Sequence, residues 1–450
     1  MPIPIRFPED YADKAWIDEI IKNKVITPYD KIQILSGTLS TDNKIITGNK
    51  EVECKEYARE KYRDIILHKQ YNRHIKDQHE GFLQPFTSGT SIEETLKYLP
   101  FCSWFLEFNF ELQKPYISHD DTPFYLIENH VRKDKVLKIP MVAASQWKGA
   151  LLSVMAREVL KKASLSEESD DYVLNRAQLI ELFGNEKENM FNFFNELRSD
   201  KKTKFERYMA DEVGVKDLNK YAKAGRLRFY PSFFDSIGIE IINPHDRAKK
   251  IGTKPIYIES VPEGGKSTFK LLYVPFDLMG RPVIQLKNAT AENLKLLANT
   301  LPKVFTVYGF GAKISSGFGV TKDNVINGRF IIMGIHGNHR KDVLPVGKPE
   351  IPPNVEEFWR NYPKDKDFSK KTSEWPGNKK KKQYYRKVKD EYKKYMQKKE
   401  VFAQAMAKHK EERNIPAQAE FRFDSIQEMK AVLGSLAIKL LEDENGEINA

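Results

Sequence analysis

The stretch GFGAKISSGFG, residues 309–319, constrains the fold more than any other part of this chain. It holds four glycines, one lysine and two serines in eleven residues. Glycine is favoured where the backbone needs a positive φ or comes very close to another group. The stretch therefore predicts a loop, and its lysine and hydroxyl groups indicate that an anion lies against that loop.

Neither standard nucleotide-binding fingerprint fits this loop. The order GxxxxGK[ST] is absent because Lys313 follows Ala312 and not a glycine. The order GxGxxG is absent because Ile314 occupies its last position. The glycines need another explanation, and a tight turn packed on a sheet is the alternative that involves no ligand.

Positive charge is concentrated in one segment of the chain. The 450 residues carry a formal net charge of +11, and residues 363–413 alone hold 18 Lys/Arg against 8 Asp/Glu. A localised basic block favours an anionic partner, most commonly nucleic acid. A solvated helix face or a basic arm is the alternative.

Cysteine usage and hydropathy limit the class of protein. Cys54 and Cys102 are the only cysteines, so no disulfide framework is implied, and a zinc site built from three or four cysteines is excluded. No apolar run approaches the roughly 18 residues of a membrane span, and the N-terminus lacks a signal-peptide pattern. We expect a cytoplasmic protein with no membrane partner.

The periodicity of the chain predicts three parts. Residues 1–98 predict an N-terminal extension of helices plus a strand at 31–39. Residues 99–345 follow the order β, α, β, ββ, α, β, with a helical insertion at about 162–222. Residues 346–450 predict a linker, a basic helix and a final strand and helix. The predicted fold class is α+β: a ferredoxin-like (RRM-like) core with a helical insertion, an N-terminal extension and a C-terminal basic helical extension.

Three local patterns make finer predictions. IPMVAASQWKGAL, residues 139–151, predicts the start of a long helix with Ser145 as its N-cap. We expect Trp147 to pack in the core, and stacking on a nucleic-acid base is the alternative. Residues 254–277 predict a β-hairpin. In the basic segment, an apolar stripe predicts a packing face with lysines outside it, and the same tyrosines also suit stacking on nucleic-acid bases. The stripe consists of Tyr385, Val388, Tyr392 and Tyr395.

Three motifs together resemble the RAMP superfamily of CRISPR proteins. IPMVAASQWKGAL is similar to the family signature IPGSSLKGxLR, and LFG at 182–184 followed by AGRLRF at 224–229 resembles a second characteristic pair. The stretch 309–319 resembles the family's glycine-rich loop. The motifs occur in the family's order, over about residues 99–334. The closest resemblance is to backbone or capping subunits of type III CRISPR effector complexes, which grip the sugar-phosphate chain of a guide RNA.

The resemblance implies an RNA-binding surface. Backbone N–H groups and the lysine of the glycine loop would lie against RNA phosphates, together with the start of the first long helix. The basic stretch 242–256 suits a further RNA contact or, as in related processing ribonucleases, metal-independent cleavage by a histidine. The candidate RNA-binding residues are Ser145, Gln146, Lys148, Gly309, Gly311, Lys313, Ser315, Ser316, Gly317, Gly319, Arg132, Lys133, His245, Arg247, Lys249 and Lys250.

The resemblance also implies a place for catalytic carboxylates. Catalytic subunits of the family cleave target RNA with an aspartate and a divalent metal, in the loop after the first strand. Glu128 occupies that aspartate's position here, with a side chain one methylene longer, and Asp120 and Asp121 are the alternatives. His119 and His130 flank the same loop as candidate bases or proton donors. All of these residues are equally typical of an exposed polar loop.

Three functions stay open from the sequence. The first is an RNA-binding subunit of a type III CRISPR interference complex, with or without a share in target cleavage. Its partners would be guide RNA, target RNA and other CRISPR effector subunits. The second is an endoribonuclease, stand-alone or bound in a complex. The third is a basic adaptor that binds only proteins. No cofactor is required for binding, and Mg²⁺, at ligands the sequence does not identify, is needed only if the chain cleaves RNA.

Overall fold

The chain forms two compact units, Met1–Ile335 with Gln418–Ala450, and His336–Ala417. The computed structural model describes residues 13–40, 42–67, 70–83, 92–120, 125–127, 129–163, 171–185, 202–211, 223–243, 245–246, 251–252, 255–334, 349–364, 366, 368, 374, 377–413 and 418–442. Within these residues, no helix is both long enough and apolar enough to cross a membrane.

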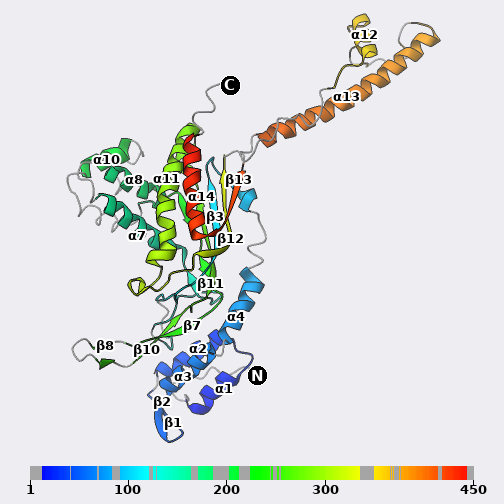
Figure 1. Ribbon diagram of the computed structural model, residues 1–450. Coiled ribbons are helices and arrows are strands. Elements are labelled where there is room, and N and C mark those ends of the chain that lie inside the picture. The colour runs from blue at the N-terminus through cyan, green and yellow to red at the C-terminus, as the bar shows by residue number, and fades with distance from the viewer. Residues whose placement is uncertain are drawn as a thin grey trace. The chain divides into compact units, whose positions relative to one another are not determined.

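A five-stranded antiparallel sheet forms the centre of the first unit (Figure 1), in the order β13-β12-β3-β11-β5. The strands are β3 (Trp104–Glu111), β5 (Leu227–Phe229), β11 (Lys266–Tyr273), β12 (Asn324–Met333) and β13 (Gln418–Ser425). Two-stranded pairs flank it: β4 (Met141–Val142) with β6 (Ser232–Phe233), β7 (Gly238–Ile242) with β10 (Ile256–Ser260), and β8 (His245–Asp246) with β9 (Ile251–Gly252). The chain is therefore a mixed α/β protein built on antiparallel strands.

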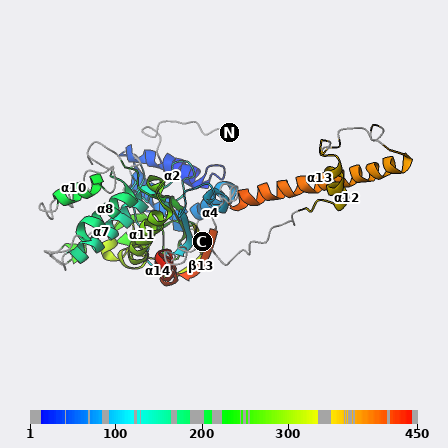
Figure 2. The same cartoon turned by 90° about the horizontal axis from the view of Figure 1, so that it is seen from above.

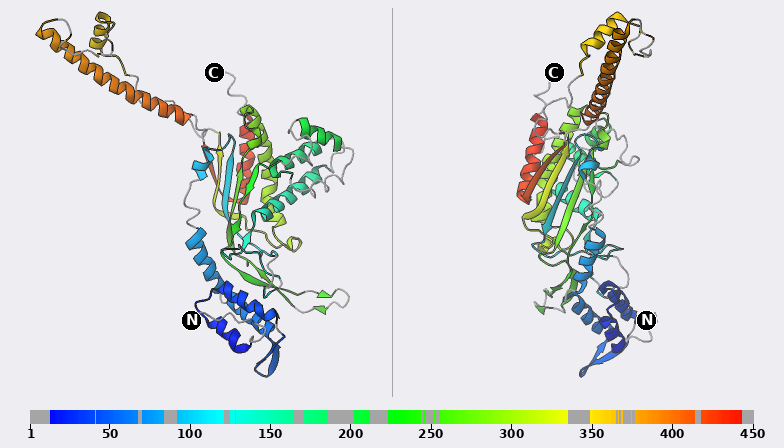
Figure 3. Two further views of the ribbon diagram at one scale, coloured as in Figure 1. Left: turned by 180° about the vertical axis from the view of Figure 1, so that it is seen from behind. Right: turned by 90° about the vertical axis from the view of Figure 1, so that its right-hand side faces the viewer.

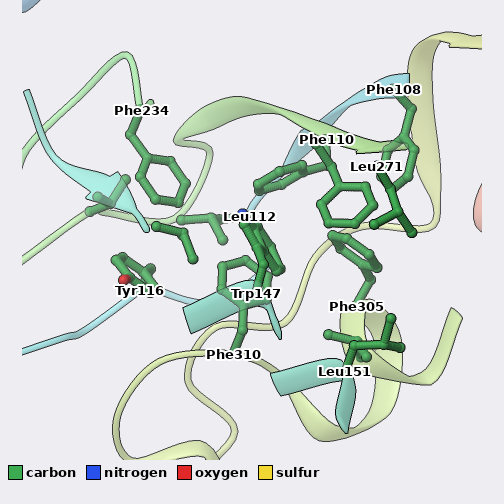
Figure 4. Close-up of a cluster of buried hydrophobic side chains, with 14 of the residues drawn as sticks. Phe108, Phe110, Leu112, Tyr116, Trp147, Leu151, Phe234, Leu271, Phe305 and Phe310 are labelled. Carbon is green, nitrogen blue, oxygen red and sulfur yellow. The ribbon is translucent and has the colours of Figure 1, made fainter. Parts of the chain in front are cut away.

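Helices cover one face of this sheet (Figures 1 and 3). They are α7 (Ala144–Ala163), α11 (Val283–Lys303), which continues through a π-helical turn at Val304–Tyr308, and α14 (Ile426–Glu442). Alternate residues of β3, including Phe108 and Phe110, point into the core beneath them, as the period of a strand requires. Figure 4 shows these two rings beside Trp147, Phe305 and Phe310.

Trp147 confirms the prediction that its indole belongs to the core and not to a base-stacking surface. Its side chain is buried among phenylalanine rings, with 5.0 Å between the centres of its ring and that of Phe269. The indole N–H donates a hydrogen bond of 2.9 Å to Ser232. A buried indole N–H needs such a partner, so this contact fixes the rotation of α7 about its axis.

The predicted helical insertion contains α8 (Asp171–Phe183) and α10 (Lys202–Asp211). Figure 2 shows α8 beside α7, the helix it follows in the chain. Val173, Ala177 and Ile180 of α8 form a small core with Met209 of α10. The insertion therefore has a hydrophobic cluster of its own.

The opposite face of the sheet is polar over most of its described residues. Glu107 of β3 pairs with Lys270 at 2.9 Å and with Arg329 at 2.8 Å, on the strands to either side. Arg329 also pairs with Glu93 of α6 (Ile92–Leu96) at 2.6 Å. Opposite charges on neighbouring strands stabilise a sheet, so these side chains satisfy one another.

The N-terminal segment is helical with one hairpin. It comprises α1 (Lys14–Lys22), α2 (Pro28–Ser36) with a 3-10 turn (Gly37–Ser40), β1 (Lys44–Thr47), β2 (Lys50–Glu53), α3 (Cys54–Leu67), and α4 (Gln70–Gln78) with a π-helical turn (His79–Leu83). The strand predicted at 31–39 is wrong. Thr27 caps a helix there by accepting the Asp30 N–H at 3.1 Å, and Pro28 occupies its first position, both strong helix-start signals.

The pair of motifs LFG and AGRLRF meets in space. Residues Gly184 and Ala224 form a β-bridge, and the Arg226 N–H donates to the Glu181 carbonyl at 2.8 Å. A Cβ atom on Gly225 would lie 2.4 Å from the Leu182 carbonyl oxygen. These glycines are therefore needed for the close approach of two backbones.

Ion pairs reinforce this junction. The buried guanidinium of Arg226 contacts Glu181 at 2.9 Å and Asp277, in the 3-10 turn Phe276–Leu278, at 2.8 Å. Burial by itself would raise the pKa of Asp277, but hydrogen bonds and charge from Arg226 and Lys223 outweigh it and hold that pKa at about 2. The ionised carboxylate is therefore the form that the fold stabilises.

The hairpin predicted at 254–277 is wrong as well. β10 pairs with β7, whereas β11 pairs with β3 and β5. The turn between them binds the end of β3 instead, since the Gly264 N–H donates to the Leu112 carbonyl and the Leu112 N–H donates to Gly265, both at 2.9 Å. These bonds direct β11 into the central sheet and leave β10 outside it.

The last strand and helix belong to the first unit and not to a C-terminal extension over 346–450. β13 pairs with the edge of β12, and α14 packs against α11. The apolar face of α14, which includes Met429, Leu433 and Leu436, is buried there. This strand and helix therefore complete the sheet and its core.

The second unit pairs two helices, α12 (Pro353–Asn361) and α13 (Lys379–Arg413). The predicted stripe is confirmed at Tyr385, Val388 and Tyr392, which pack against Phe358 and Phe368. The hydroxyl groups of Tyr362 and Tyr385 lie 2.6 Å apart. A small aromatic core therefore holds the first half of α13 on α12.

We expect Leu433→Ala to lower the free energy of unfolding by roughly 2–5 kcal/mol, because it leaves a cavity between α14 and α11. Ile438→Ala is the matched control, since Ile438 lies on the same helix with 55% of its side chain exposed. Urea denaturation followed by circular dichroism measures both. Equal effects would show that α14 lies outside the core.

We expect the stabilising effect of Asp277 to depend on acid. Its pKa is about 2 in the fold, below the roughly 3.9 of an unfolded aspartate. The stabilisation is thus complete above about pH 4 and is lost as the pH falls toward 2. In urea titrations, the difference between the parent and Asp277→Asn should shrink over this range. Asp211→Asn, at an exposed site, should show no such change.

Candidate nucleic-acid interface

A hollow of about 320 Å³ opens beside the glycine loop. Its walls come from three segments: the glycine loop after α11, the first half of α7, and the loop after β3. The residues that line the hollow include Gln146, Arg157, His119 and residues 309–312. Two of the three sequence motifs thus meet around one cavity.

One face of α7 lines the hollow. Gln146, Ala150, Ser153 and Arg157 recur at intervals of three and four residues, so they lie on one side of the helix. The Gln146 side-chain carbonyl accepts the Ala143 N–H at 2.9 Å, and Ala143 precedes the first residue of α7. The position before the helix is therefore Ala143, and the prediction of Ser145 as N-cap is wrong.

Among the described residues that line the hollow, Arg157 is the only arginine or lysine. The sequence prediction missed it. Its exposed guanidinium lies 5.5 Å from the ring centre of Tyr308. No carboxylate pairs with it among the residues that the structure describes. The nearby Glu158 is instead bound by Lys303 at 2.6 Å and by the Tyr308 hydroxyl at 2.9 Å. Helical periodicity counted onward from Gln146 would have found Arg157.

Three of the four loop glycines serve internal packing. Gly309, Gly311 and Gly319 have φ of 72°, 96° and 73°, values that side chains disfavour. A Cβ atom on them would lie 2.5, 2.4 and 2.0 Å from the carbonyl oxygens of Phe318, Ile117 and Phe310, respectively. The tight-turn explanation therefore holds for these positions.

Several loop N–H groups are also used inside the protein. Phe310 donates to Gly319 at 3.1 Å, Gly319 to Pro115 at 2.9 Å, and Ala312 to Ile117 at 2.7 Å. The prediction that backbone N–H groups of this loop lie against RNA phosphates is therefore wrong for these three residues.

The tip of the loop remains open. Lys313, Ser315 and Ser316 are exposed, and a Cβ atom on Gly317 would meet nothing within 4 Å. Lys313 itself has a φ of 56°, an uncommon backbone conformation for a residue other than glycine. The loop packing thus presents a lysine and two hydroxyl groups together at the surface.

The loop after β3 brings a histidine to the hollow. The exposed His119 lines it, and its ring centre lies 6.1 Å from that of the buried His130. Burial lowers the pKa of His130, which favours its neutral form at pH 7. Asp120 is half-buried, whereas Asp121 and Glu128 lie outside the described residues.

The described residues do not assemble a metal site. Within them, no group of three or more His, Cys, Asp or Glu side chains lies close enough together to hold a metal ion. Of the carboxylates that the family resemblance implies for a divalent metal, only Asp120 lies within the described residues. We therefore derive no reaction step through a metal.

Lys133 was predicted to bind RNA, and that prediction is wrong. Its ammonium is buried and forms an ion pair with the fully buried carboxylate of Glu259. It also lies 3.1 Å from the Tyr125 hydroxyl. Its neighbour Arg132 is half-exposed and donates its N–H to the Ser118 hydroxyl at 2.8 Å.

The Glu259 carboxylate joins three distant segments. It accepts the Tyr125 hydroxyl at 2.8 Å and the Val131 N–H at 2.9 Å, and it also accepts the hydroxyl of Tyr62 from α3. Every buried charge needs such partners. This cluster fixes the segment around Val131, next to the wall of the hollow.

The other predicted residues do not line the hollow. Lys148 is half-buried, two residues beyond Gln146 and so about 200° around α7. Ser145 is exposed at the helix start. Arg247, Lys249 and Lys250 lie outside the described residues, as does the side chain of His245, whose backbone belongs to β8.

An antiparallel sheet backed by helices, with a glycine loop and a helix start around one hollow, defines a mixed α/β protein with a candidate site for an anionic ligand. The sequence profile of the RAMP superfamily matches residues 38–322, more than half of the chain. The protein belongs to the RAMP superfamily. The match begins within the segment 1–98, so it includes the hairpin β1–β2 and α3.

Among solved structures, one chain of the "Cryo-EM structure of the Type III-B Cmr-beta bound to cognate target RNA" is similar at 15% identity, with a TM-score of 0.35. The similarity covers 69% of this chain and 96% of that chain. No curated protein matches the sequence.

We expect Glu259→Gln to lower the free energy of unfolding by roughly 3–5 kcal/mol, because it leaves the Lys133 ammonium buried without a counter-charge. Adding Lys133→Met should recover part of the loss. Urea denaturation measures both variants. Glu51→Gln breaks an exposed pair with Lys44 and is the control; a similar cost there would contradict a structural role for the buried pair.

Proposed function

We propose that the chain is an RNA-binding subunit of a type III CRISPR interference complex and holds the backbone of a guide RNA at the hollow. The observation that carries the proposal is the convergence of Arg157, Gln146 and the glycine loop on one cavity. RAMP superfamily membership supports it. Guide RNA, target RNA and other CRISPR effector subunits would be the partners, in the cytoplasm.

The chemistry of the hollow suits a phosphodiester. An arginine offers a planar fork of donors that matches phosphate oxygens, and Arg157 keeps this fork exposed beside Tyr308. The Gln146 carbonyl is used by the helix start, so its amide N–H₂ is the group left to donate. Lys313 adds positive charge from the loop tip. These groups recognise the backbone and not the bases, as a guide of any sequence requires.

The exposed face of the sheet suits RNA less well. Sheets that bind RNA in RRM-type domains stack bases on exposed aromatic rings. Here the corresponding β3 positions are Glu107, Asn109 and Glu111. Glu107 is bound by Lys270 of the neighbouring strand β11, and Glu111 is bound by Lys322, which lies just before β12. This difference favours the hollow over the sheet as the RNA site.

We also propose that the core is ferredoxin-like. The elements β3, α7, β5, β11, α11 and β12 follow the order β, α, β, β, α, β along the chain. In the sheet, β3 and β11 are the two inner strands of these four. β13 and α14 are additions beyond this unit.

The proposal is limited to binding. Cleavage of target RNA with Mg²⁺ needs carboxylates in fixed positions, and Asp121 and Glu128 lie outside the described residues. Processing by His245 rests on a side chain that also lies outside them. An adaptor that binds only proteins gives no role to the Arg157 guanidinium in the hollow, which pairs with no carboxylate among the residues described.

We expect Arg157→Gln and Lys313→Gln each to weaken binding of the full chain to a single-stranded guide RNA by roughly threefold to tenfold. Each should also reduce the slope of log K against log salt by about 0.7, because one phosphate contact is lost. Filter binding over a series of salt concentrations measures both quantities.

Lys430→Gln is the control, because Lys430 is an exposed lysine of α14 that does not line the hollow. It should leave both quantities unchanged. Parent-like binding by Arg157→Gln and Lys313→Gln together would refute the site. Purification of the chain from its complex free of RNA, judged by ultraviolet absorbance, would favour the adaptor instead.

A further inference from the structure

The helix α13 carries a dense and one-sided positive charge. Between Lys379 and Gln404, where its side chains are described, it holds eleven Lys/Arg and three Asp/Glu. At about 100° per residue, only Lys381 and Lys399 of the eleven fall outside one half of the helix. The other nine form a surface about 180° wide, which we name the basic face.

The basic face lies opposite the buried side of α13. Tyr385, Val388 and Tyr392 point into the aromatic core with α12, and the basic side chains occupy the side turned away from them. Arg386, Lys387, Lys393 and Lys394 are exposed to solvent. The apolar side is therefore committed within the unit, and the charged side is the one available to a partner.

The positions of these charges lower the intrinsic stability of α13. The first turn of α13 contains four consecutive lysines and no acidic residue. Cations at a helix N-terminus oppose the helix dipole, and like charges four residues apart, such as Lys389 and Lys393, destabilise a helix further. An anion bound along the basic face would remove both penalties. A helix that needed charge only for solubility would favour a mixture of positive and negative side chains.

The spacing of the charges fits one strand of nucleic acid. From Lys379 to Lys398 the helix rises about 29 Å at 1.5 Å per residue, which gives about one cation per 3 Å on the basic face. Each strand of a duplex carries one phosphate per about 3.4 Å of helix axis, so the linear charge density of the basic face is close to that of one stacked strand. A flexible single strand can follow a straight helix over this whole length, whereas the curved backbone of a duplex diverges from the helix.

A membrane surface fits less well. Basic amphipathic helices bind membranes by inserting their apolar side, and here that side is occupied by Phe358 and Phe368. We propose that the basic face of α13 binds the backbone of single-stranded RNA, as a second surface separate from the hollow. The choice of RNA over other polyanions rests on the proposed function.

The test compares full-length variants of equal charge. Lys387→Gln, Lys393→Gln and Lys394→Gln together remove three exposed cations from the basic face. We expect this variant to bind a uridine homopolymer about tenfold more weakly, with a slope of log K against log salt reduced by about 2, since each contact to a single strand contributes about 0.7. Lys→Arg at the same three positions should keep the parent slope.

The matched control removes the same charge elsewhere, through Lys24→Gln, Lys430→Gln and Lys439→Gln, at three exposed lysines of the first unit. It should bind RNA like the parent. Circular dichroism should show the same helix content in all variants. An α13 variant that binds RNA as tightly as this control overturns the proposal.

Two further outcomes keep the two RNA sites distinguishable. If Arg157→Gln is without effect while the α13 variant loses binding, the hollow fails and the basic face stands. If polyglutamate displaces the homopolymer from the parent as well as RNA of equal charge does, the face binds acidic chains in general, and the inference of an RNA surface is wrong.

Discussion

The buried ion pair between Glu259 and Lys133 is the interaction on which the candidate site depends. Removing two charges from water is costly, and such pairs seldom add net stability. Their value lies in position, since this carboxylate holds α3, β10 and the loop after β3 together. Next to Lys133, the backbone N–H of Arg132 donates to the Ser118 hydroxyl, and Ser118 lines the hollow. The wall of the site is thus held in place by a buried ion pair that does not itself line the hollow.

In the glycine loop, some residues serve internal packing and others are exposed where a ligand could bind. Three of its glycines allow main-chain segments to approach more closely than any side chain permits, and the fourth lies at an open tip beside Lys313. The packed glycines do not touch a ligand. They hold the loop against the segment after β3, and that contact places the tip and the Gly309–Ala312 backbone at the hollow.

The two units present positive charge in different ways. In the first unit, a single exposed arginine lies in a cavity shaped by three segments, which suits the precise placement of one phosphate. In the second unit, the charge is spread along a straight helix whose apolar side is already packed. That arrangement suits a long flexible polyanion without reading its sequence. The first unit offers geometry and the second offers charge density.

Local sequence patterns were the source of most of the predictions that the structure and the family match confirm. The ordered motifs indicated the RAMP superfamily, which the profile match confirms. The apolar periodicity correctly placed Trp147 in the core and Tyr385, Val388 and Tyr392 on a packing face. Each motif and each apolar stripe is a pattern of residues close together in the chain, and the order of the motifs is also a property of the sequence, so the sequence by itself determines these features.

Tertiary structure decided what depends on distant partners. Nothing near Lys133 in the sequence reveals that its counter-charge lies 126 residues away, so a lysine that reads as an RNA contact is buried. β13 likewise joins a sheet whose other strands lie far earlier in the chain. The hollow itself exists only where α7, the glycine loop and the segment after β3 converge. Such features arise from pairing between remote segments, and periodicity and spacing do not encode which segments meet.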